Sequence, residues 1–483
     1  MTSSDQLVAP ADIRGINALA RSWSDPETTI HPVEIERIVI EDDAIDALVE
    51  EVRSAAGHGR TALVVDRTPM KRGSDDLKPL LLDSLGRVTR LTVRHLPAEP
   101  AGEFHADLPA VRRLGEELRD YDVVVAAGSG TIVDAVKYAR HLAVASTGVA
   151  LPFICFPTAA SVTAYTSSLA ALTVDGVKRT LPARPPDVII CDLRTLAAAP
   201  RIMTQAGFAD VIARGVSHGD WFLAYEIGMD DHFSQVPARL LEDAERAMIE
   251  SAAQVATGRI DAVRKVMEAG LLAGMAMSLV NQTAPLSGWE HVMSHFFDLT
   301  ADHDDRRVAL HGGQVGVATL VSALAYERDW KGLDTGRLRA DISKKDEREY
   351  RERIECVFGR YDPSGKLAAE VWTDFSKKIA RWRAASESRK RFVDRYRAGE
   401  LDAPLRQAVR SSAEIDDALK RAGAPRRFDE LDKPIPAATA RAAIRHAHLL
   451  RARFTLGDLL DRGGRLTDEA GGELLAALDR MNG

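Results

Sequence analysis

The sequence predicts a Rossmann-like α/β domain followed by an all-α C-terminal domain. Up to about residue 200, short β-branched runs alternate with helical patterns. Beyond that point these runs stop, and apolar residues recur at spacings of three and four as far as the C-terminus. A small-residue turn also joins a buried run to a helical pattern at 123–137. This alternation is typical of βαβ units, in which helices cover both faces of a parallel sheet.

The elements are expected in the following order. Residues 1–30 are polar and weakly patterned, which predicts a loosely held extension. Residues 31–200 are expected to form the α/β dinucleotide-binding domain, and residues 201–483 the helical metal-binding and substrate domain. The expected strands are 36–40, 61–65, 88–93, 122–126, 153–156 and 188–191, and the clearest early helices are 107–119 and 131–142.

Composition limits the classes of protein. A chain of 483 residues exceeds what one hydrophobic core usually organises, which favours two or three domains. The net charge of -7 disfavours nucleic acid and anionic membrane surfaces as partners. The 3 cysteines are far apart, which argues against a disulfide framework and favours the cytoplasm. No signal-peptide pattern or bilayer-length apolar run is evident, so a soluble protein is expected. The charged region 331–430 mixes both signs and predicts solvated helix faces.

The turn after the run 123–127 carries the first chemical signal, in Gly128, Ser129, Gly130, Thr131 and Ile132. Glycines let the backbone approach a pyrophosphate, and the N–H groups at the start of the following helix stabilise its charge. The turn therefore predicts a dinucleotide cradle. It lacks the usual Gly-x-Gly-x-x-Gly spacing, so a simple tight connection is the alternative.

Asp66 ends the expected strand 61–65, where an acidic side chain can accept hydrogen bonds from an adenosine ribose. A 2′-phosphate would be repelled there, so NADH is expected to be preferred over NADPH. A turn or helix-cap role for Asp66 is the alternative.

Candidate metal ligands occur in three segments of the helical half. The first contains Asp210, the second contains His291 and His295, and the third contains His311. The spacing of four places His291 and His295 on one face of a helix. One carboxylate oxygen and two imidazole nitrogens occupy three positions of a divalent ion and leave room for substrate oxygen atoms. Zinc is the expected metal, with nickel or iron as alternatives; a core or surface role is the ordinary alternative for any single histidine.

Taken together, these motifs resemble the superfamily of iron-containing alcohol dehydrogenases, glycerol dehydrogenase, glycerol-1-phosphate dehydrogenase and dehydroquinate synthase. The likeness to bacterial glycerol-1-phosphate dehydrogenases is the strongest and covers about residues 38–460. The motifs in family order are Ala-Gly-Ser-Gly-Thr-Ile-Val-Asp at 127–134, Pro-Thr-Ala-Ala-Ser at 157–161 with Tyr-Thr-Ser-Ser at 165–168, Ala-Gly-Phe-Ala-Asp at 206–210, Glu-His-Val-Met-Ser-His at 290–295, and Leu-His-Gly at 310–312. The segment 451–455 also resembles the family's last helical segment.

The resemblance implies a dehydroquinate synthase-like fold and assigns roles residue by residue. It implies that 128–132 hold the pyrophosphate and that Thr158, Ser161 and Ser167 line the nicotinamide side. It further implies that Asp210, His291 and His311 bind the metal and that His295 faces the substrate. His295 and Asp210 are then the expected catalytic residues, and a homodimer is the expected assembly.

Two positions depart from the family pattern. The family usually has Asp where this chain has Thr163, so a charged substrate-facing group has become a neutral hydroxyl. Ala209 replaces a glycine next to a ligand. The first change predicts an altered substrate, and a tolerated variation is the alternative.

The expected activity is a metal-dependent NAD dehydrogenase that interconverts a hydroxyl and a carbonyl on a small polar, phosphorylated substrate. A cyclase or lyase of the dehydroquinate synthase type, which uses NAD transiently, is one alternative. A dehydrogenase of non-phosphorylated polyols or aldehydes and a non-catalytic scaffold are others. A metallohydrolase is disfavoured, since no His-Glu-x-x-His motif occurs.

Overall fold

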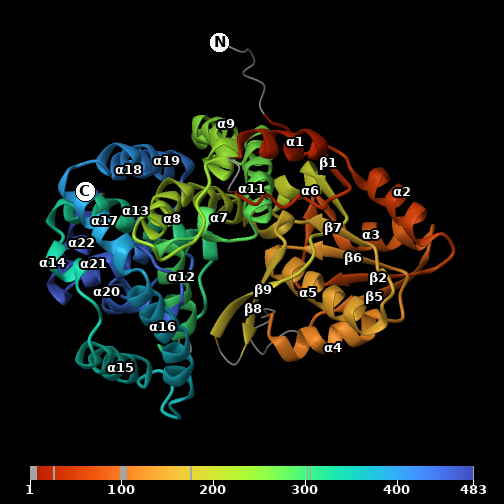
Figure 1. The fold of residues 1–483 in the computed structure, drawn as a ribbon. Coiled ribbons are helices and arrows are strands. Elements are labelled where there is room, and N and C mark those ends of the chain that lie inside the picture. Colours follow the sequence, from red (N-terminus) through yellow and green to blue (C-terminus); the bar gives the residue numbers. More distant parts are fainter. Residues whose placement is uncertain are drawn as a thin grey trace. The chain divides into compact units, whose positions relative to one another are not determined.

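The computed structural model describes residues 8–24, 28–97, 106–174, 177–301, 303–304 and 306–481. The chain forms two compact units (Figure 1). The first unit comprises Met1–Val211 and Gln235–Gln282, and the second comprises Ile212–Ser234 and Thr283–Gly483. These units are defined by which parts of the chain pack together. The division into domains at residues 30 and 200 stays a prediction. Among the described residues, no helix is both long and apolar enough to cross a membrane.

A six-stranded sheet forms the centre of the first unit. Its strand order is β1-β10-β7-β6-β2-β5, and every pair is parallel. The strands are β1 (Arg37–Glu41), β2 (Arg60–Val65), β5 (Arg90–His95), β6 (Val123–Gly128), β7 (Phe153–Pro157) and β10 (Val188–Asp192). Each expected strand is present, with ends that differ by no more than two residues. The central strands are continuous apolar runs because both faces of a parallel sheet are covered.

Helices cover both faces of this sheet (Figure 1). Helices α2 (Ile45–Ala56) and α3 (Leu77–Gly86) share a core with alternate residues of the strands, such as Leu63, Val125 and Ile154. Helices α4 (Leu108–Leu118) and α5 (Gly130–Thr147) pack together at the other side. The unit is completed by α6 (Leu193–Ala198), α7 (Arg201–Ile212), α9 (Val236–Glu250), α10 (Ala252–Ala256), α11 (Ile260–Val280) and the 3-10 turn η1 (Ala164–Thr166).

Two features of the first unit differ from the sequence expectation. Within the expected extension, Ile13–Trp23 form helix α1, which packs against α9 and buries Ile16 and Ala20. The four-residue spacing of these two apolar residues places both on the face of the helix that packs against α9, so this part of the extension is not loosely held. Residues 1–7 and 25–27 of the same extension lie outside the described part. The hairpin β8 (Leu169–Val174) and β9 (Val177–Pro182) was also not expected. Its mixed polar and apolar residues carry a weaker pattern than the buried strands.

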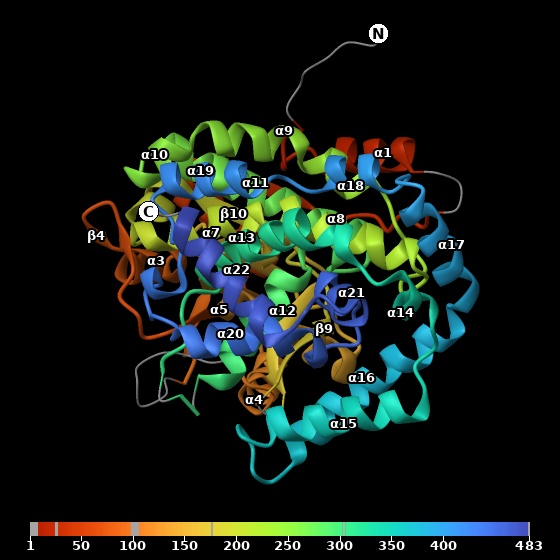
Figure 2. The same ribbon diagram turned by 90° about the vertical axis from the view of Figure 1, so that its left-hand side faces the viewer.

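The second unit is helical throughout its described residues, as expected. Helix α12 (Trp289–Thr300) packs against α13 (His311–Asp329), α8 (Arg214–Glu226) and the 3-10 turn η5 (Ala447–Leu450). Figure 2 shows α15 (Lys344–Phe358) and α16 (Lys366–Ala384) as a pair at the lower edge of the view. The other α-helices of this unit are α14 (Thr335–Arg339), α17 (Ser386–Arg397), α18 (Asp402–Ala408), α19 (Ser412–Ala422), α20 (Ala437–His446), α21 (Leu456–Arg462) and α22 (Asp468–Met481).

Candidate active site

The expected phosphate loop joins β6 to α5. Strand β6 ends at Gly128, Ser129 is extended, and α5 begins at Gly130 and runs for 18 residues. The side chain of Ser129 does not cap the helix. A Cβ on Gly130 would collide with the side chain of Val162, so close packing requires glycine here. The first turn of a long helix thus lies at the carboxyl end of a parallel strand, which is where nucleotide phosphates bind in such folds.

The segment after β7 lies beside this loop. Gly128 pairs in register with Pro157, and the backbone N–H of Thr158 donates to the carbonyl of Gly128 at 3.1 Å. Thr158, Ser161 and Ser167 are all buried. The structure therefore brings two of the expected cofactor-binding segments together at one edge of the sheet.

Lys137 connects α5 to this segment and was given no role in the sequence analysis. Its buried ammonium donates to Asp134 Oδ1 at 2.8 Å and to the carbonyls of Ala164 and Leu169 at 2.9 and 2.8 Å. These bonds hold the segment that carries Thr163 against the helix of the phosphate loop. An acid–base pair three residues apart on an otherwise apolar helix was the available signal.

Asp66 follows β2, which lies next to β6 in the sheet. Its Oδ1 accepts the backbone N–H of Thr68 at 3.0 Å, and its Oδ2 accepts the hydroxyl of Thr68 at 2.7 Å. Lys78 Nζ lies 3.7 Å from Asp66 Oδ1. Asp66 therefore stabilises a turn, and each carboxylate oxygen retains a further lone pair for a ribose hydroxyl.

The three expected metal ligands lie together. The ligand atoms offered by Asp210, His291 and His311 are all within 4.8 Å of one another. Asp210 and His291 are buried, and His311 is half-buried. One carboxylate and two imidazoles are a donor set that suits a divalent ion and leaves further coordination positions open.

Asp210 also contacts the residue that departs from the family pattern. The backbone N–H of Thr163 donates to Asp210 Oδ2 at 3.0 Å. On α7, a Cβ on Gly207 would collide with the carbonyl of Ala160, so the helix approaches the 158–163 segment closely. The backbone contact of Thr163 does not depend on its side chain, whereas substitution of Gly207 would displace α7.

Glu290, which had no assigned role, orients His291. Glu290 is fully buried, and its Oε1 lies 2.8 Å from His291 Nδ1 and accepts the backbone N–H of Gly288 at 2.6 Å. With Nδ1 held in this way, Nε2 is the nitrogen through which His291 would bind a metal ion. A second buried carboxylate, that of Asp220, lies near Glu290. Its burial, followed by the negative charge of Glu290, raises the pKa of Asp220 to about 7. Asp220 Oδ2 accepts the N–H of Trp289 at 2.8 Å and so holds the start of α12.

His295, the expected substrate-facing residue, stacks on His311 with ring centroids 6.0 Å apart and planes 13° apart. Arg451 Nη2 lies 3.3 Å from His295 Nδ1. A guanidinium can only donate, so Nδ1 accepts this bond and the neutral ring carries its proton on Nε2. The structure therefore adds an arginine to the candidate site.

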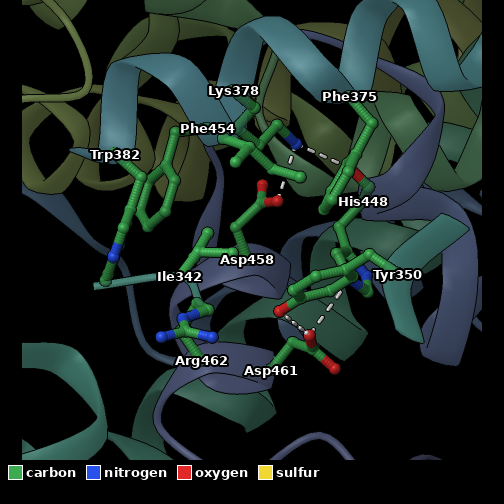
Figure 3. Close-up of a pocket in the computed structure, with 11 residues that line it drawn as sticks. Ile342, Tyr350, Phe375, Lys378, Trp382, His448, Phe454, Asp458, Asp461 and Arg462 are labelled. Atoms are coloured by element: carbon green, nitrogen blue, oxygen red, sulfur yellow. Dashed lines mark hydrogen bonds and ion pairs between the residues drawn. The ribbon is translucent and has the colours of Figure 1, made fainter. Parts of the chain in front are cut away.

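A separate pocket in the second unit does not include any of these residues (Figure 3). It is lined by Ile342, Tyr350, Phe375, Lys378, Ile379, Trp382, His448, Phe454, Asp458, Asp461 and Arg462. Several of its polar side chains are paired with one another: Lys378 forms an ion pair with Asp458, and the hydroxyl of Tyr350 donates to Asp461. Such a pocket favours a structural role.

Comparison with known proteins points to one family. Residues 39–200 match the family model described as iron-containing alcohol dehydrogenase. The chain is 27% identical over 441 residues to a glycerol-1-phosphate dehydrogenase [NAD(P)+] of Bacillus licheniformis, covering 91% of this chain and 92% of that protein. It is 30% identical over 298 residues to the enzyme of the same name from Bacillus subtilis, covering 62% of this chain and 73% of that protein.

Solved structures share the fold. Glycerol dehydrogenase from Schizosaccharomyces pombe aligns with a TM-score of 0.55 at 16% identity, covering 95% of this chain and 93% of that one. A 1,3-propanediol oxidoreductase aligns with a TM-score of 0.56 at 16% identity, covering 93% and 99%. The predicted combination of a parallel α/β sheet and a helical region is thereby confirmed.

Proposed function

Because the chain belongs to the iron-containing alcohol dehydrogenase family, we propose that it is an NAD-dependent, metal-dependent dehydrogenase of a small polar substrate. It interconverts a hydroxyl and a carbonyl group. The observation that carries this proposal is the convergence of Asp210, His291 and His311. The names of the relatives from Bacillus support a phosphorylated three-carbon substrate.

The proposed metal is zinc, with nickel or iron as alternatives, and its ligands are Asp210, His291 and His311. A bound divalent ion supplies Lewis-acid polarisation of the substrate oxygen. Glu290 holds His291 through Nδ1, and the N–H of Thr163 holds the carboxylate of Asp210. These contacts orient the ligand set in advance of binding.

His295 is the proposed proton donor and acceptor for the substrate oxygen. Arg451 occupies its Nδ1, so Nε2 carries the exchangeable proton. The same guanidinium offers a planar, permanently charged partner for an anionic group of the substrate. We therefore assign Arg451 to the recognition of the substrate's phosphate group.

NAD is proposed to bind along residues 128–132 through backbone N–H groups at the start of α5. Thr158, whose backbone N–H donates to the carbonyl of Gly128, is proposed to contact the nicotinamide side together with Ser161 and Ser167. Asp66 is proposed to accept the ribose hydroxyls and to favour NADH over NADPH. The ammonium of Lys78 at 3.7 Å offsets part of that negative charge, so the expected preference is modest, about tenfold in kcat/KM.

The central experiment loads the purified chain with Zn²⁺ and measures NADH oxidation with dihydroxyacetone phosphate and with dihydroxyacetone. A higher kcat/KM for the phosphorylated ketone supports the proposal. Arg451→Gln should lower that kcat/KM by about ten- to a hundredfold through the lost charged hydrogen bond and change the value for dihydroxyacetone much less. Equal effects on both ketones would contradict the role of Arg451.

The same assay separates the alternative reaction class. A cyclase or lyase of the dehydroquinate synthase type regenerates its NAD, so it produces no net change in NADH in a single turnover. Consumption of one NADH for each ketone reduced supports a dehydrogenase. A product formed without net NADH consumption would contradict it.

Thr163 is proposed to line the substrate pocket and to select a substrate that differs from glycerol 1-phosphate near this residue. A buried polar group that is matched or left unmatched changes specificity by about ten- to a hundredfold. The test compares wild type and Thr163→Asp with dihydroxyacetone phosphate across a pH series at equal metal and NAD content. Efficient reduction by the wild type and no change in the variant would make Thr163 a neutral variation.

We also propose a homodimer as the assembly, on the basis of the sequence expectation alone. Light scattering coupled to size-exclusion chromatography tests it directly. A mass of 52.6 kDa, that of one chain, would contradict it.

A further inference from the structure

We propose that Ser294 and Gln314 are positioning residues that fix the imidazole of His311 in the tautomer able to bind a metal ion. This inference rests on the proposed metal-dependent function. It concerns two side chains to which no role has been assigned above, one on α12 and one on α13.

The argument begins with the side-chain amide of Gln314. Its Nε2 donates to the carbonyl of Ala309 at 3.1 Å and to Asp298 Oδ1 at 3.1 Å. A backbone carbonyl can only accept, so the amide nitrogen must face Ala309. The amide oxygen of Gln314 therefore faces Ser294.

The hydroxyl of Ser294 is the next link. Ser294 Oγ lies 2.8 Å from Gln314 Oε1 and 2.9 Å from His311 Nδ1. A hydroxyl has one hydrogen, and an amide oxygen has none. Ser294 must therefore donate to Gln314, and it has only a lone pair left for the ring.

The ring of His311 completes the accounting. Since Ser294 Oγ can only accept, His311 Nδ1 must carry the hydrogen and donate it. In the neutral ring Nε2 is then without a hydrogen and presents a lone pair. That is the form of imidazole that binds a divalent ion, and His311 is one of the three clustered ligands.

Burial makes this network costly to break. Ser294 and Gln314 are both 0% exposed, so water does not replace a lost partner at low cost. Gln314 also holds Ala309, two residues before His311, and so anchors the start of α13.

The two histidines are held by different chemistry. His291 is backed by the carboxylate of Glu290, which contributes negative charge to the centre. His311 is backed by a neutral hydroxyl and amide, so loss of Ser294 alters the tautomer of His311 and leaves the charge of the centre unchanged. Loss of such a partner typically lowers metal affinity by about 10- to 100-fold.

The first experiment measures the Zn²⁺ dissociation constant of the metal-free full chain by competition with a chelator. Ser294→Ala should bind about 10- to 100-fold more weakly than wild type. The matched control is Ser322→Ala on α13, the helix that carries Gln314 and His311, because Ser322 is 0% exposed and its Oγ has no hydrogen-bond partner among the described residues. The control removes a buried hydroxyl without touching the network and should change the dissociation constant by less than about threefold.

The second experiment observes the tautomer directly by ¹⁵N NMR of histidine-labelled, metal-free protein, with His311 assigned by its absence in His311→Ala. The wild type should show hydrogen on Nδ1 and a bare Nε2, and Ser294→Ala should show a mixture. A wild-type ring with hydrogen on Nε2 would overturn the proposal, and so would a Ser294→Ala affinity equal to that of Ser322→Ala. Failure of wild type to bind Zn²⁺, Co²⁺ or Ni²⁺ at all would instead overturn the metal centre itself and the inference with it.

Discussion

Two groups of buried polar side chains in the second unit differ in what they leave available. The ligand cluster consists of His291 and His311 with Glu290, Ser294 and Gln314. The α16 cluster consists of Lys378, Asp458, Asp461, Arg353 and His448, around the pocket of Figure 3. Both are buried and both are hydrogen-bonded, so burial alone does not distinguish a candidate site from a structural core.

In the α16 cluster, charged groups satisfy one another. Lys378 Nζ donates to Asp458 Oδ1 at 2.6 Å and to the carbonyl of His448 at 2.7 Å. Arg353 donates to Asp461 Oδ1 at 2.9 Å. Burial acts to raise the pKa of Asp461, but the contacts from His448 and Arg353 outweigh it, and the pKa lies well below its usual value.

In the ligand cluster, by contrast, a neighbouring side chain holds each ring through its Nδ1. Glu290 occupies Nδ1 of His291, and Ser294 occupies Nδ1 of His311. Each ring also offers a ligand atom within 4.8 Å of a carboxylate oxygen of Asp210. The comparison indicates that acceptor atoms that converge on one point distinguish a candidate site. Buried charges that pair with one another are typical of the structural core. The two clusters should therefore respond in opposite ways to substitution.

The largest effect is expected for His311→Ala in the ligand cluster. Loss of a ligand should abolish stable metal binding and lower kcat/KM by about 1000-fold, because a bound metal contributes several kcal/mol to catalysis. The unfolding free energy of the metal-free protein should change by only about 1 kcal/mol. Elemental analysis and steady-state rates check the first part, and urea unfolding checks the second. Full metal occupancy in the variant would contradict the ligand assignment.

The reverse result is expected for Lys378→Met in the α16 cluster. Removing one partner of a buried ion pair leaves Asp458 uncompensated, which costs about 3–5 kcal/mol of unfolding free energy. The control is Lys377→Met on the same helix, whose ammonium pairs with Asp374 at 3.0 Å but whose side chain is 64% exposed. That variant should lose less than about 1 kcal/mol.

Urea unfolding of both lysine variants measures this difference, and Zn²⁺ affinity should be unchanged in each. A Lys378→Met variant that is as stable as Lys377→Met would show that the α16 cluster does not carry the stability assigned to it.

Acid should weaken the region of the α16 cluster through His446. Burial, followed by the charges of His448 and Arg445, lowers the pKa of His446 to about 3. The unfolded chain, with a histidine pKa near about 6.5, therefore binds a proton that the folded chain does not accept as pH falls from about 6.5 towards 3. The stability present above pH 6.5 is lost across that window.

Unfolding free energies of wild type and His446→Gln at several pH values between about 7.5 and 4.5 test this statement. The wild type should lose more stability on acidification than the variant. Parallel profiles would contradict it.

The smallest effect is expected for Tyr350→Phe. The variant removes one hydroxyl that donates to Asp461 Oδ2 at 2.8 Å, while the charged donor Arg353 remains. A loss of about 1 kcal/mol is expected in urea unfolding, with unchanged metal binding. A loss of unfolding free energy as large as that of Lys378→Met would contradict this expectation, because the hydroxyl would then contribute as much stability as a buried charge.

Much of the fold was predictable because its strands are buried on both sides. Runs such as 123–127 and 188–191 are apolar throughout and begin with three β-branched residues, which favours a strand buried on both faces. Helix α1 was not predicted, since Ile16 and Ala20 are too few to stand out in a polar segment and become buried only in the folded chain, where α1 packs against α9.

The sequence by itself determined the sheet, the helical second part and the identity of the candidate ligands, because residue types and local spacing carry that information. Only the tertiary structure decided which nitrogen of each ring a neighbouring side chain holds and what lies beside His295. Arg451 and His295 are separated by 156 positions in the chain, and Ser294 and His311 by 17. Such contacts depend on how helices pack, and local periodicity within one helix does not specify its neighbours.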